Sequence, residues 1–350
     1  MAKDTPLPMG NPLENPARFL EFGQELAADR TGGLALALAE RALARHGDDP
    51  LWQALAGAVL RHGVPGFHVR MLRDGRRNAA YRAAIERFAP GRKVLDIGTG
   101  SGLLAMMAAR AGAAQVYACE ENAMLAAAAR KVIAANGLAD RITVFDRHSG
   151  KLDRLRDLDG GVDMVVSEVF SDCLVGEGVL ESLAHARAEL ATPGALFLPE
   201  TASVMVALAQ FAPLVDTAGI VEGLDLSGFA PHLTPRSHVY ADDPALHLRS
   251  DPEPILHFDF GTGDPPSNGE SRCTLTSNGG QVSGIAQWLH LRFADDITYE
   301  NRPGSGTDLH WVINLAACEP RASAPGDRFE CGACYSGSTL VKWVRSKAKD

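Results

Sequence analysis

One stretch of the sequence, residues 94–122, constrains the fold of this chain more than any other. A short apolar run over Val94–Ile97 indicates a buried strand, and the turn Gly98-Thr99-Gly100-Ser101-Gly102 follows it directly. The next segment is rich in alanine, leucine and methionine and has no proline, which favours a helix. A second apolar run over Gln115–Cys119 ends at the acidic pair Glu120-Glu121. A strand, a glycine-rich turn, a helix and a strand that ends in an acid form the unit that binds a nucleotide-like cofactor.

The spacing of the glycines narrows the class of cofactor. They follow the pattern G-x-G-x-G instead of the G-x-G-x-x-G of dinucleotide enzymes, and Asp96 lies just before the turn. In this form, the stretch resembles the first motif of class I S-adenosylmethionine (SAM) methyltransferases. The glycines would let the backbone approach the cofactor closely, and the acid after the second strand would accept hydrogen bonds from two ribose hydroxyls. The alternative is a structural turn in another kind of α/β protein.

Composition and charge set limits on location and partners. The chain has 350 residues, enough for two domains, and a formal net charge of −9. This charge argues against a general nucleic-acid-binding protein and is compatible with a basic protein partner, although mild acidity also serves solubility alone. The sequence shows no N-terminal signal pattern and no apolar run long enough to span a membrane. We therefore expect a cytoplasmic protein that binds neither nucleic acid directly nor a membrane.

The cysteines form no recognisable disulfide framework. The chain has six of them, scattered in sequence: Cys119, Cys173, Cys273, Cys318, Cys331 and Cys334. The last two have CxxC spacing, but a zinc site normally needs a second pair of ligands, and none is suitably spaced. We therefore predict ordinary cysteines and no metal.

A helical segment is expected before the cofactor unit. Residues 16–46 and 51–60 have helical patterns, separated by a Gly-Asp-Asp-Pro turn. Residues 1–62 therefore resemble a tetratricopeptide-type helix pair. One pair is too short for a solenoid, so a helical cap on the following domain is the favoured interpretation.

The cofactor domain is expected to cover residues 63–200 and an all-β domain residues 201–345. In the first, we expect strands over 141–145, 162–166 and 195–198, and helices over 124–135 and 181–190. In the second, alternating runs lie between Pro, Gly, Asn and Asp turns and predict strands over 202–208, 255–260, 273–276 and 284–293. Residues 211–236 interrupt these strands, are rich in Gly and Pro, and could form an arm that packs on a partner subunit or a long loop.

Two glutamates bracket the loop after the fourth expected strand. Glu168 stands at the carboxyl end of that strand, where ligands of open parallel sheets bind, and Glu177 follows nine residues later between two glycines. Two carboxylates over a cofactor site could hold a guanidinium, a planar cation with five donors in a fixed fork. The alternatives are a metal pair and two surface acids. A metal would usually need a histidine or a third acid placed beside the two glutamates, and we favour the guanidinium.

Two further groups are candidates for binding. Arg76 and Arg77 lie on a polar turn just upstream of the cofactor unit, where an arginine could clamp a carboxylate such as the one in SAM, or where the turn could simply be basic and solvated. His310 and Trp311 lie at a junction between a loop and a strand. The tryptophan could contact a cationic substrate through its ring face, although such a pair more often packs in a core.

Several stretches together resemble one family, the protein arginine methyltransferases. MLRDGRRNAAY, VLDIGTGSG, Glu120, SEVFSDCLVGEG and LHW occur in the order and approximate spacing of that family, over residues 63–345. The two glutamates of the "double-E" loop are the specific feature. The form of this loop resembles the divergent branch of the family, whose members often carry two tandem modules. This chain has one module, and it has Val169-Phe170-Ser171 and Leu309 where the main branch has Trp-Met-Gly and Thr, so the number of methyl groups transferred stays open.

The resemblance implies a fold, a cofactor and partners. It implies an α/β class I SAM-methyltransferase domain of Rossmann-like form, followed by a β-barrel-like domain that binds substrate. It implies SAM as cofactor, an arginine-containing protein or peptide as substrate, and a homodimer. Two alternatives remain: a SAM-dependent methyltransferase of a different substrate, and a SAM-fold scaffold or pseudoenzyme that recruits partners through residues 16–60.

The resemblance also implies roles for particular residues. Cofactor binding falls to Met71, Arg77, Asp96, Gly98, Gly100, Gly102, Glu120, His148 and Ser149. The substrate arginine would be held by Glu168 and Glu177, with Trp311 shaping its channel. His310 would pair with Asp74 across the two domains.

Overall fold

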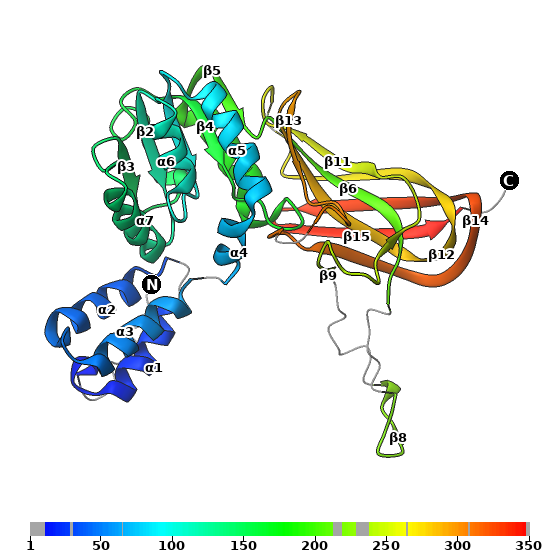
Figure 1. The fold of residues 1–350 in the computed structure, drawn as a ribbon, viewed down its shortest axis with the longest axis horizontal. Coiled ribbons are helices and arrows are strands. Elements are labelled where there is room, and N and C mark those ends of the chain that lie inside the picture. The colour runs from blue at the N-terminus through cyan, green and yellow to red at the C-terminus, as the bar shows by residue number, and fades with distance from the viewer. Residues whose placement is uncertain are drawn as a thin grey trace.

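A computed structural model describes residues 11–28, 31–64, 66–212, 219–228, 238–263, 265–306 and 309–347. Three parts follow one another along the chain: a group of helices, a parallel sheet with helices, and an antiparallel domain (Figure 1). The predicted fold class, a Rossmann-like domain followed by a barrel-like β domain, is confirmed. The boundaries predicted between the three parts stay predictions.

The parallel sheet has five strands in the order β3-β2-β1-β4-β5. They are β1 (Lys93–Ile97), β2 (Gln115–Cys119), β3 (Ile142–Phe145), β4 (Val162–Ser167) and β5 (Ala191–Leu198). The accompanying helices are α4 (Phe67–Arg73), α5 (Gly75–Phe88), α6 (Leu103–Arg110), α7 (Ala123–Ala135) and α8 (Val179–His185). Because β1, β2 and β4 are almost wholly buried, they read as continuous apolar runs in the sequence.

Two elements near the end of this sheet differ from the prediction. The helix expected over 181–190 ends as an α-helix at His185 and continues as a π-helical turn over Ala186–Leu190. The strand expected to begin at Ala195 begins at Ala191 and includes Pro193. Proline is tolerated there because β5 is the edge strand of its sheet and its pairing with β4 is irregular at this point.

The antiparallel sheet has eight strands, with β10-β6-β12-β14-β15 as its main order. Its strands are β6 (Thr201–Gln210), β9 (His238–Val239), β10 (His247–Leu248), β11 (Glu253–Asp259), β12 (Asn268–Ala294), β13 (Ile297–Glu300), β14 (Ile313–Ser336) and β15 (Thr339–Ser346). The separate strands expected over 273–276 and 284–293 are parts of the one long strand β12. The pairing of β12 with β14 is irregular at two points in the glycine-containing segment between them.

The two sheets share one buried core. Tyr81 of α5 meets Phe293 of β12 edge to face, with ring centroids 4.6 Å apart. Phe170, after β4, lies 5.9 Å from Phe260 of the antiparallel domain. This continuous core fixes the antiparallel domain against the carboxyl ends of the parallel strands.

The described residues of the N-terminal part form three α-helices where the sequence predicted two. They are α1 (Pro16–Ala27), α2 (Gly33–His46) and α3 (Pro50–His62), preceded by a short turn, η1 (Pro12–Glu14). The expected long first helix is divided before Gly32, which has a left-handed φ of 60° and is the N-cap of α2. Phe19, Trp52 and Val59 form a separate small core, which Met124 of α7 completes. Among the described residues, no helix is long and apolar enough to cross a bilayer.

Candidate active site

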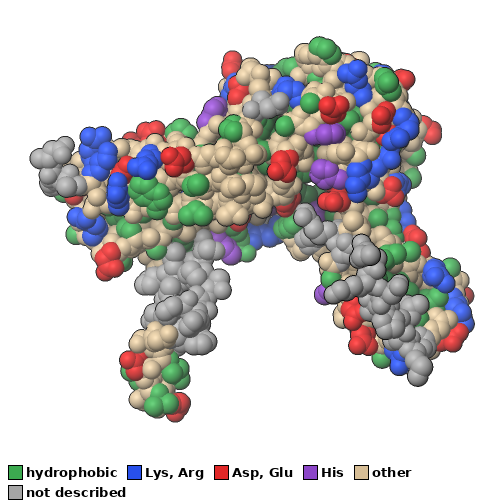
Figure 2. Space-filling model, turned by 180° about the vertical axis from the view of Figure 1, so that it is seen from behind, with side chains coloured by type: hydrophobic (Ala, Val, Ile, Leu, Met, Phe, Trp, Pro, Cys, Tyr) green, Lys and Arg blue, Asp and Glu red, His purple; other side chains and the backbone are tan. Residues whose placement is uncertain are grey.

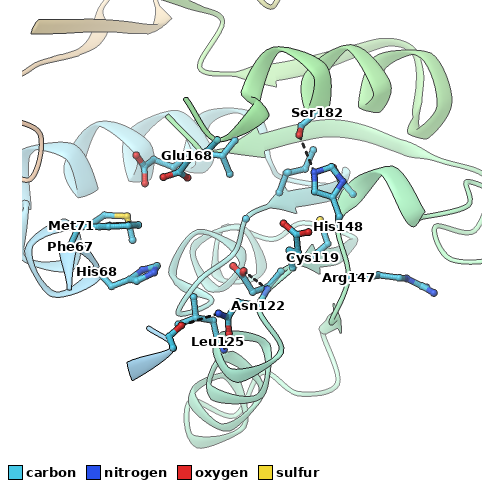
Figure 3. Close-up of a pocket in the computed structure, with 18 of the residues that line it drawn as sticks. Phe67, His68, Met71, Cys119, Asn122, Leu125, Arg147, His148, Glu168 and Ser182 are labelled. Carbon is cyan, nitrogen blue, oxygen red and sulfur yellow. Dashed lines mark hydrogen bonds between the residues drawn. The ribbon is translucent and has the colours of Figure 1, made fainter. Parts of the chain in front are cut away.

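The carboxyl ends of the parallel strands border a pocket of about 390 Å³ (Figure 3). It lies beside the point where the strand order reverses, between β1 and β4, which is where open parallel sheets bind ligands. Its lining includes Gly98 after β1, Glu120 after β2, His148 after β3, and Glu168 after β4. Four strand ends therefore contribute side chains or backbone to one cavity.

The glycine-rich turn allows a ligand to approach the backbone closely. Gly98, Gly100 and Gly102 all have left-handed φ angles, of 72°, 53° and 83°. A Cβ atom on Gly98 would lie 2.3 Å from a side-chain carbon of Val169, so no larger residue fits without movement. Gly102 is the N-cap of α6, so the N-terminus of this helix lies next to the turn.

Asp96 shapes this turn from within the protein. Its Oδ2 accepts hydrogen bonds from Thr99 Oγ1 at 2.6 Å and from the Ala105 amide at 3.0 Å. The side chain is buried, and burial raises its pKa to about 6. Asp96 does not line the pocket, so its contribution to a cofactor site is indirect.

Glu120 is held in place for a ligand with hydroxyl groups. Its two carboxylate oxygens accept hydrogen bonds from the Gly100 amide at 3.0 Å and the Asn122 amide at 2.9 Å. Burial raises the pKa of Glu120, and these two amides offset part of that effect. A carboxylate oxygen accepts more than one hydrogen bond, so each still has capacity for a hydroxyl.

His148 and Ser149 form another side of the pocket. The Gly150 amide donates to His148 Nδ1 at 3.0 Å, while His148 Nε2 faces Ser182 Oγ at 3.4 Å (Figure 3). Ser149 is buried, and among the described residues its Oγ has no hydrogen-bond partner. Because buried polar groups are nearly always paired, this hydroxyl is available for a polar group in the pocket.

The N-terminal helices supply a wall that the sequence did not predict. Ala27, Ala28 and His62 line the pocket together with Phe67 and His68. Asn122, which follows β2, links this wall to the parallel sheet, since its Nδ2 donates to the Gly63 carbonyl at 3.0 Å. No local sequence signal marks these residues, because the N-terminal helices reach the pocket through tertiary packing, in which α2 contacts α7 and Met124 of α7 joins their core.

Glu168 lies at the other end of the pocket, beside a guanidinium and an imidazole. Its Oε2 is 2.9 Å from Arg77 Nη2, and its Oε1 is 3.5 Å from His310 Nε2. Its side chain is 5% exposed. Burial raises the pKa of Glu168, but Arg77 and His310 outweigh burial and hold the pKa below its ordinary value. Glu168 is therefore a carboxylate at neutral pH.

Asp74 and His310 are brought together behind Glu168. His310 Nδ1 lies 3.1 Å from Asp74 Oδ2, and the Arg77 amide donates to Asp74 Oδ1 at 2.9 Å. The Tyr299 hydroxyl also donates to Asp74, a contact that the sequence did not predict. Burial lowers the pKa of His310, but hydrogen bonds to Asp74 and Glu168 outweigh it and raise the pKa above its ordinary value. Asp74, which caps the N-terminus of α5, and His310, in the segment before β14, thus belong to one polar network.

Glu177 and Trp311 differ in their surroundings. Glu177 is exposed, has a left-handed φ of 59°, and lines both this pocket and a neighbouring one of about 520 Å³. Trp311 is buried, and its Nε1 donates to the Phe170 carbonyl at 3.0 Å. Trp311 supports the loop between the two glutamates and does not line either pocket.

The predicted residues fall into two groups by position. Those that line the pocket are Met71, Gly98, Glu120, His148, Ser149, Glu168 and Glu177. Those that lie behind the lining are Asp74, Arg77, Asp96, Gly100, Gly102, His310 and Trp311. Their individual roles stay predictions.

The parallel sheet order, the left-handed glycine turn after β1 and the acid after β2 are the arrangement expected of a methyltransferase of the SAM-dependent class. Residues 82–197 match a sequence profile described as ribosomal protein L11 methyltransferase (PrmA). Over 265 residues, which cover 73% of this chain and 71% of that protein, the sequence is 41% identical to an arginine N(omega)-methyltransferase of Streptomyces achromogenes subsp. streptozoticus. The chain belongs to the protein arginine methyltransferase family, and as a member it is a SAM-dependent enzyme.

Other similar proteins agree with this assignment. Protein arginine N-methyltransferase 7 of Oryza sativa subsp. japonica is 34% identical over 263 residues, which cover 67% of this chain and 36% of that protein. The chain thus spans about a third of the rice relative. The fold matches a Trypanosoma brucei PRMT1 enzyme–prozyme complex with AdoHcy, with a TM-score of 0.70, 24% identity, and coverage of 81% of this chain and 94% of that one. It also matches Arabidopsis thaliana protein arginine methyltransferase 10, with a TM-score of 0.64, 20% identity, and coverage of 80% and 97%.

Proposed function

We propose that this protein transfers a methyl group from SAM to a terminal nitrogen of an arginine guanidinium held between Glu168 and Glu177. The observation that carries the proposal is that both glutamates line the same pocket as Gly98, Glu120 and His148. A cofactor at the strand ends and a cation at the glutamates would therefore share one cavity.

The residues at the strand ends fit SAM. Gly98 permits close approach of a ligand to the backbone, Glu120 offers acceptors to ribose hydroxyls, and Ser149 offers an unpaired hydroxyl beside His148. Arg77 is the residue that the resemblance assigns to the methionine carboxylate, but it lies behind the lining with its guanidinium on Asn78 and Glu168, so this contact would require the side chain to turn toward the pocket. When bound, the cofactor supplies a methyl group on a sulfonium, which is open to attack by a nitrogen lone pair.

The two glutamates would make the guanidinium a better nucleophile. A protonated guanidinium reacts poorly because its lone pairs are delocalised, and its pKa above about 12 prevents simple deprotonation. Hydrogen bonds to Glu168 and Glu177 would concentrate positive charge on the nitrogens they contact and leave the remaining nitrogen richer in electrons. Arg77 takes only part of the acceptor capacity of Glu168, so the carboxylate can still bind a substrate. Positioning and fixed charge would supply most of the rate.

His310 is placed to receive the proton released on transfer. With Asp74 accepting from Nδ1, the neutral ring carries its lone pair on Nε2, which faces Glu168 Oε1 at 3.5 Å. A proton on Glu168 could therefore pass to His310 Nε2. The raised pKa of His310 favours its protonated form at this point.

The substrate is proposed to be arginine within a protein or peptide. The neighbouring pocket, which shares Glu177, is lined by Glu121 and Glu181 and by no lysine or arginine among the described residues. Free arginine would bring an α-carboxylate into these acidic surroundings, whereas a peptide would not. Free arginine is the second candidate, because the Streptomyces relative is named as an arginine methyltransferase without reference to protein.

Incubation with labelled SAM tests both candidates in one experiment. The protein would be offered a mixed set of Arg/Gly-rich peptides in one reaction and free L-arginine in another, and the products analysed as amino acids after hydrolysis. Methylarginine from the peptides is the expected result, and its form would give the product type. Methylarginine from free arginine alone would select the second candidate. No methylarginine from either, with SAM binding intact by calorimetry, would refute the proposed activity.

A further inference from the structure

The loop that carries the two glutamates is fastened to the antiparallel domain at two backbone carbonyls. The Phe170 carbonyl accepts from Trp311 Nε1, and the Asp172 carbonyl accepts from Gln287 Nε2 at 2.9 Å and Asn314 Nδ2 at 3.2 Å. Both of these amide side chains come from the long strand pair, where Gln287 of β12 lies directly opposite Asn314 of β14.

This loop needs support because part of its backbone is strained. Leu174 and Glu177 have left-handed φ angles of 71° and 59°, a conformation that residues with a Cβ atom rarely adopt. Such conformations persist only where surrounding contacts hold them. Within the loop, the Gly176 amide donates to Ser171 Oγ at 3.0 Å, and the contacts from the antiparallel domain hold the loop from outside.

Gln287 has only one amide orientation that satisfies both of its neighbours. It is fully buried, and its Oε1 accepts from Lys342 Nζ of β15 at 2.7 Å. A lysine ammonium has three donors and no acceptor, so the amide oxygen must face it. The amide nitrogen is then left to face the Asp172 carbonyl. A flipped amide would put nitrogen against ammonium and oxygen against carbonyl, which is repulsive at both ends.

Lys342 lies beside the loop as well as beside Gln287. Its side chain is partly buried, and burial lowers its pKa, while the nearby Cys173 and Asp172 offset part of that effect. Neither Lys342 nor Gln287 lines the pocket that would hold cofactor and substrate. Any effect of these residues on methyl transfer must therefore pass through the loop.

We propose that Lys342 is a positioning residue, which fixes the amide of Gln287 so that this amide holds the glutamate-bearing loop in its reactive shape. The proposal rests on the proposed function, because it takes Glu168 and Glu177 as the residues that hold substrate. It assigns the antiparallel domain a direct part in setting the geometry of the active site. A lysine that only stabilised the β domain would affect folding and leave the loop unchanged.

The test compares Lys342→Met with Lys347→Met. Lys347 follows the same strand and is exposed. Its Nζ donates to Thr274 Oγ1, which does not belong to the glutamate-bearing loop. Each variant would be measured for SAM affinity by calorimetry, for kcat and KM toward the arginine substrate, and for amide hydrogen exchange over residues 170–177. For Lys342→Met we expect kcat/KM to fall about 10- to 100-fold, because small misplacements of reacting groups cost this much. We expect SAM affinity within about twofold of the wild type, since the cofactor residues are untouched.

Two further variants show whether Lys342 acts through Gln287. Gln287→Met should cause a similar loss, and the double variant should be no worse than Gln287→Met alone, because both changes remove the same contact. Lys342→Arg should retain much of the activity, since a guanidinium is also a donor without an acceptor. The thermal midpoint of each variant would show that it is folded at the assay temperature.

The outcomes separate this proposal from the proposed function. Wild-type kcat/KM in Lys342→Met, additive losses in the double variant, or unchanged hydrogen exchange over the loop would overturn the positioning role. Faster hydrogen exchange over 170–177 in Lys342→Met, together with no methylarginine from the wild type, would support the positioning role of Lys342 and refute the proposed methyl transfer.

Discussion

Glu168 and Glu177 line the same pocket, but the protein surrounds them differently. Glu168 is buried between Arg77 and His310, so it contributes to folding as well as to any chemistry. Glu177 is exposed and held by the backbone of its loop. Substitutions at these two positions should therefore separate function from stability.

We expect Glu177→Gln to abolish most methyl transfer and to lower the free energy of unfolding less than Glu168→Gln does, because Glu177 is exposed. Glu168→Gln should also abolish transfer, but it should lower the free energy of unfolding by about 3 kcal/mol because the buried Arg77 guanidinium loses its carboxylate. Both variants should still bind SAM. Kinetics, urea denaturation and calorimetry would check this, with Glu189→Gln on the surface as the control. Loss of SAM binding in Glu168→Gln would contradict the assigned role.

Asp96 gives a prediction about pH. Burial raises its pKa from 3.8 to about 6, so the folded state holds the proton more tightly than the unfolded chain. The contribution of Asp96 to the free energy of unfolding is therefore greatest below about pH 4, declines as the pH rises to about 6, and is constant above that. We expect the unfolding free energy of the wild type, relative to Asp96→Asn, to decline by about 3 kcal/mol over this interval. A difference that grows with pH would show that the pKa is lowered.

At the level of elements, the N-terminal helices form part of the pocket wall. Phe19 lies in the core of these helices, with its ring 5.3 Å from that of Trp52, and does not line the pocket. Phe19→Ala should cost these helices about 3–5 kcal/mol and loosen them. We expect the Kd for SAM to rise several-fold because Ala27, Ala28 and His62 would no longer be held in place.

The matched control for this prediction is Phe329→Ala. Phe329 is equally buried, at 2% exposed, but lies in β14 of the antiparallel domain. It should lower stability and leave the Kd for SAM unchanged. Equal SAM affinities for the two variants, measured by calorimetry below both melting transitions, would mean that the helices are not part of the cofactor site.

Elements whose signals are local could be predicted from the sequence. The strands β1, β2 and β4 are short apolar runs with clear turns, and Gly98 and Glu120 are marked by their place after such runs. Elements and residues whose positions depend on contacts distant in sequence could not be predicted. Tyr299 and Gln287 reach Asp74 and Asp172 only through tertiary packing, and neither has a neighbour in sequence that points to its role. The division of the first helix was missed because Ala-rich patterns on both sides of Gly32 look continuous.

At the level of the whole molecule, one segment projects from the two sheets. It is the hairpin of β7 (Ile220–Val221) and β8 (Leu224–Asp225), and Figure 2 shows hydrophobic side chains at its tip. This hairpin lies in the predicted arm over 211–236, of which residues 213–218 and 229–236 lie outside the described residues. Ile220 and Leu224 are 69% and 67% exposed. A two-stranded hairpin is at best marginally stable alone, so its apolar face is suited to a partner subunit.

We propose that the hairpin joins two copies of this chain into a homodimer, and we expect Ile220→Ser/Leu224→Ser to convert it to a monomer. The apolar area lost would remove most of the hydrophobic gain on association. Val341→Ser is the control, because Val341 is also exposed, at 58%, but lies on β15. Light scattering over a concentration series would give the mass of each variant, and kcat/KM would be measured at the same concentrations. If the dimer completes the active site, activity should fall with dimer content. A wild type that is monomeric and fully active would refute the proposal, whereas a dimer that survives the double variant would place its interface elsewhere on the molecule.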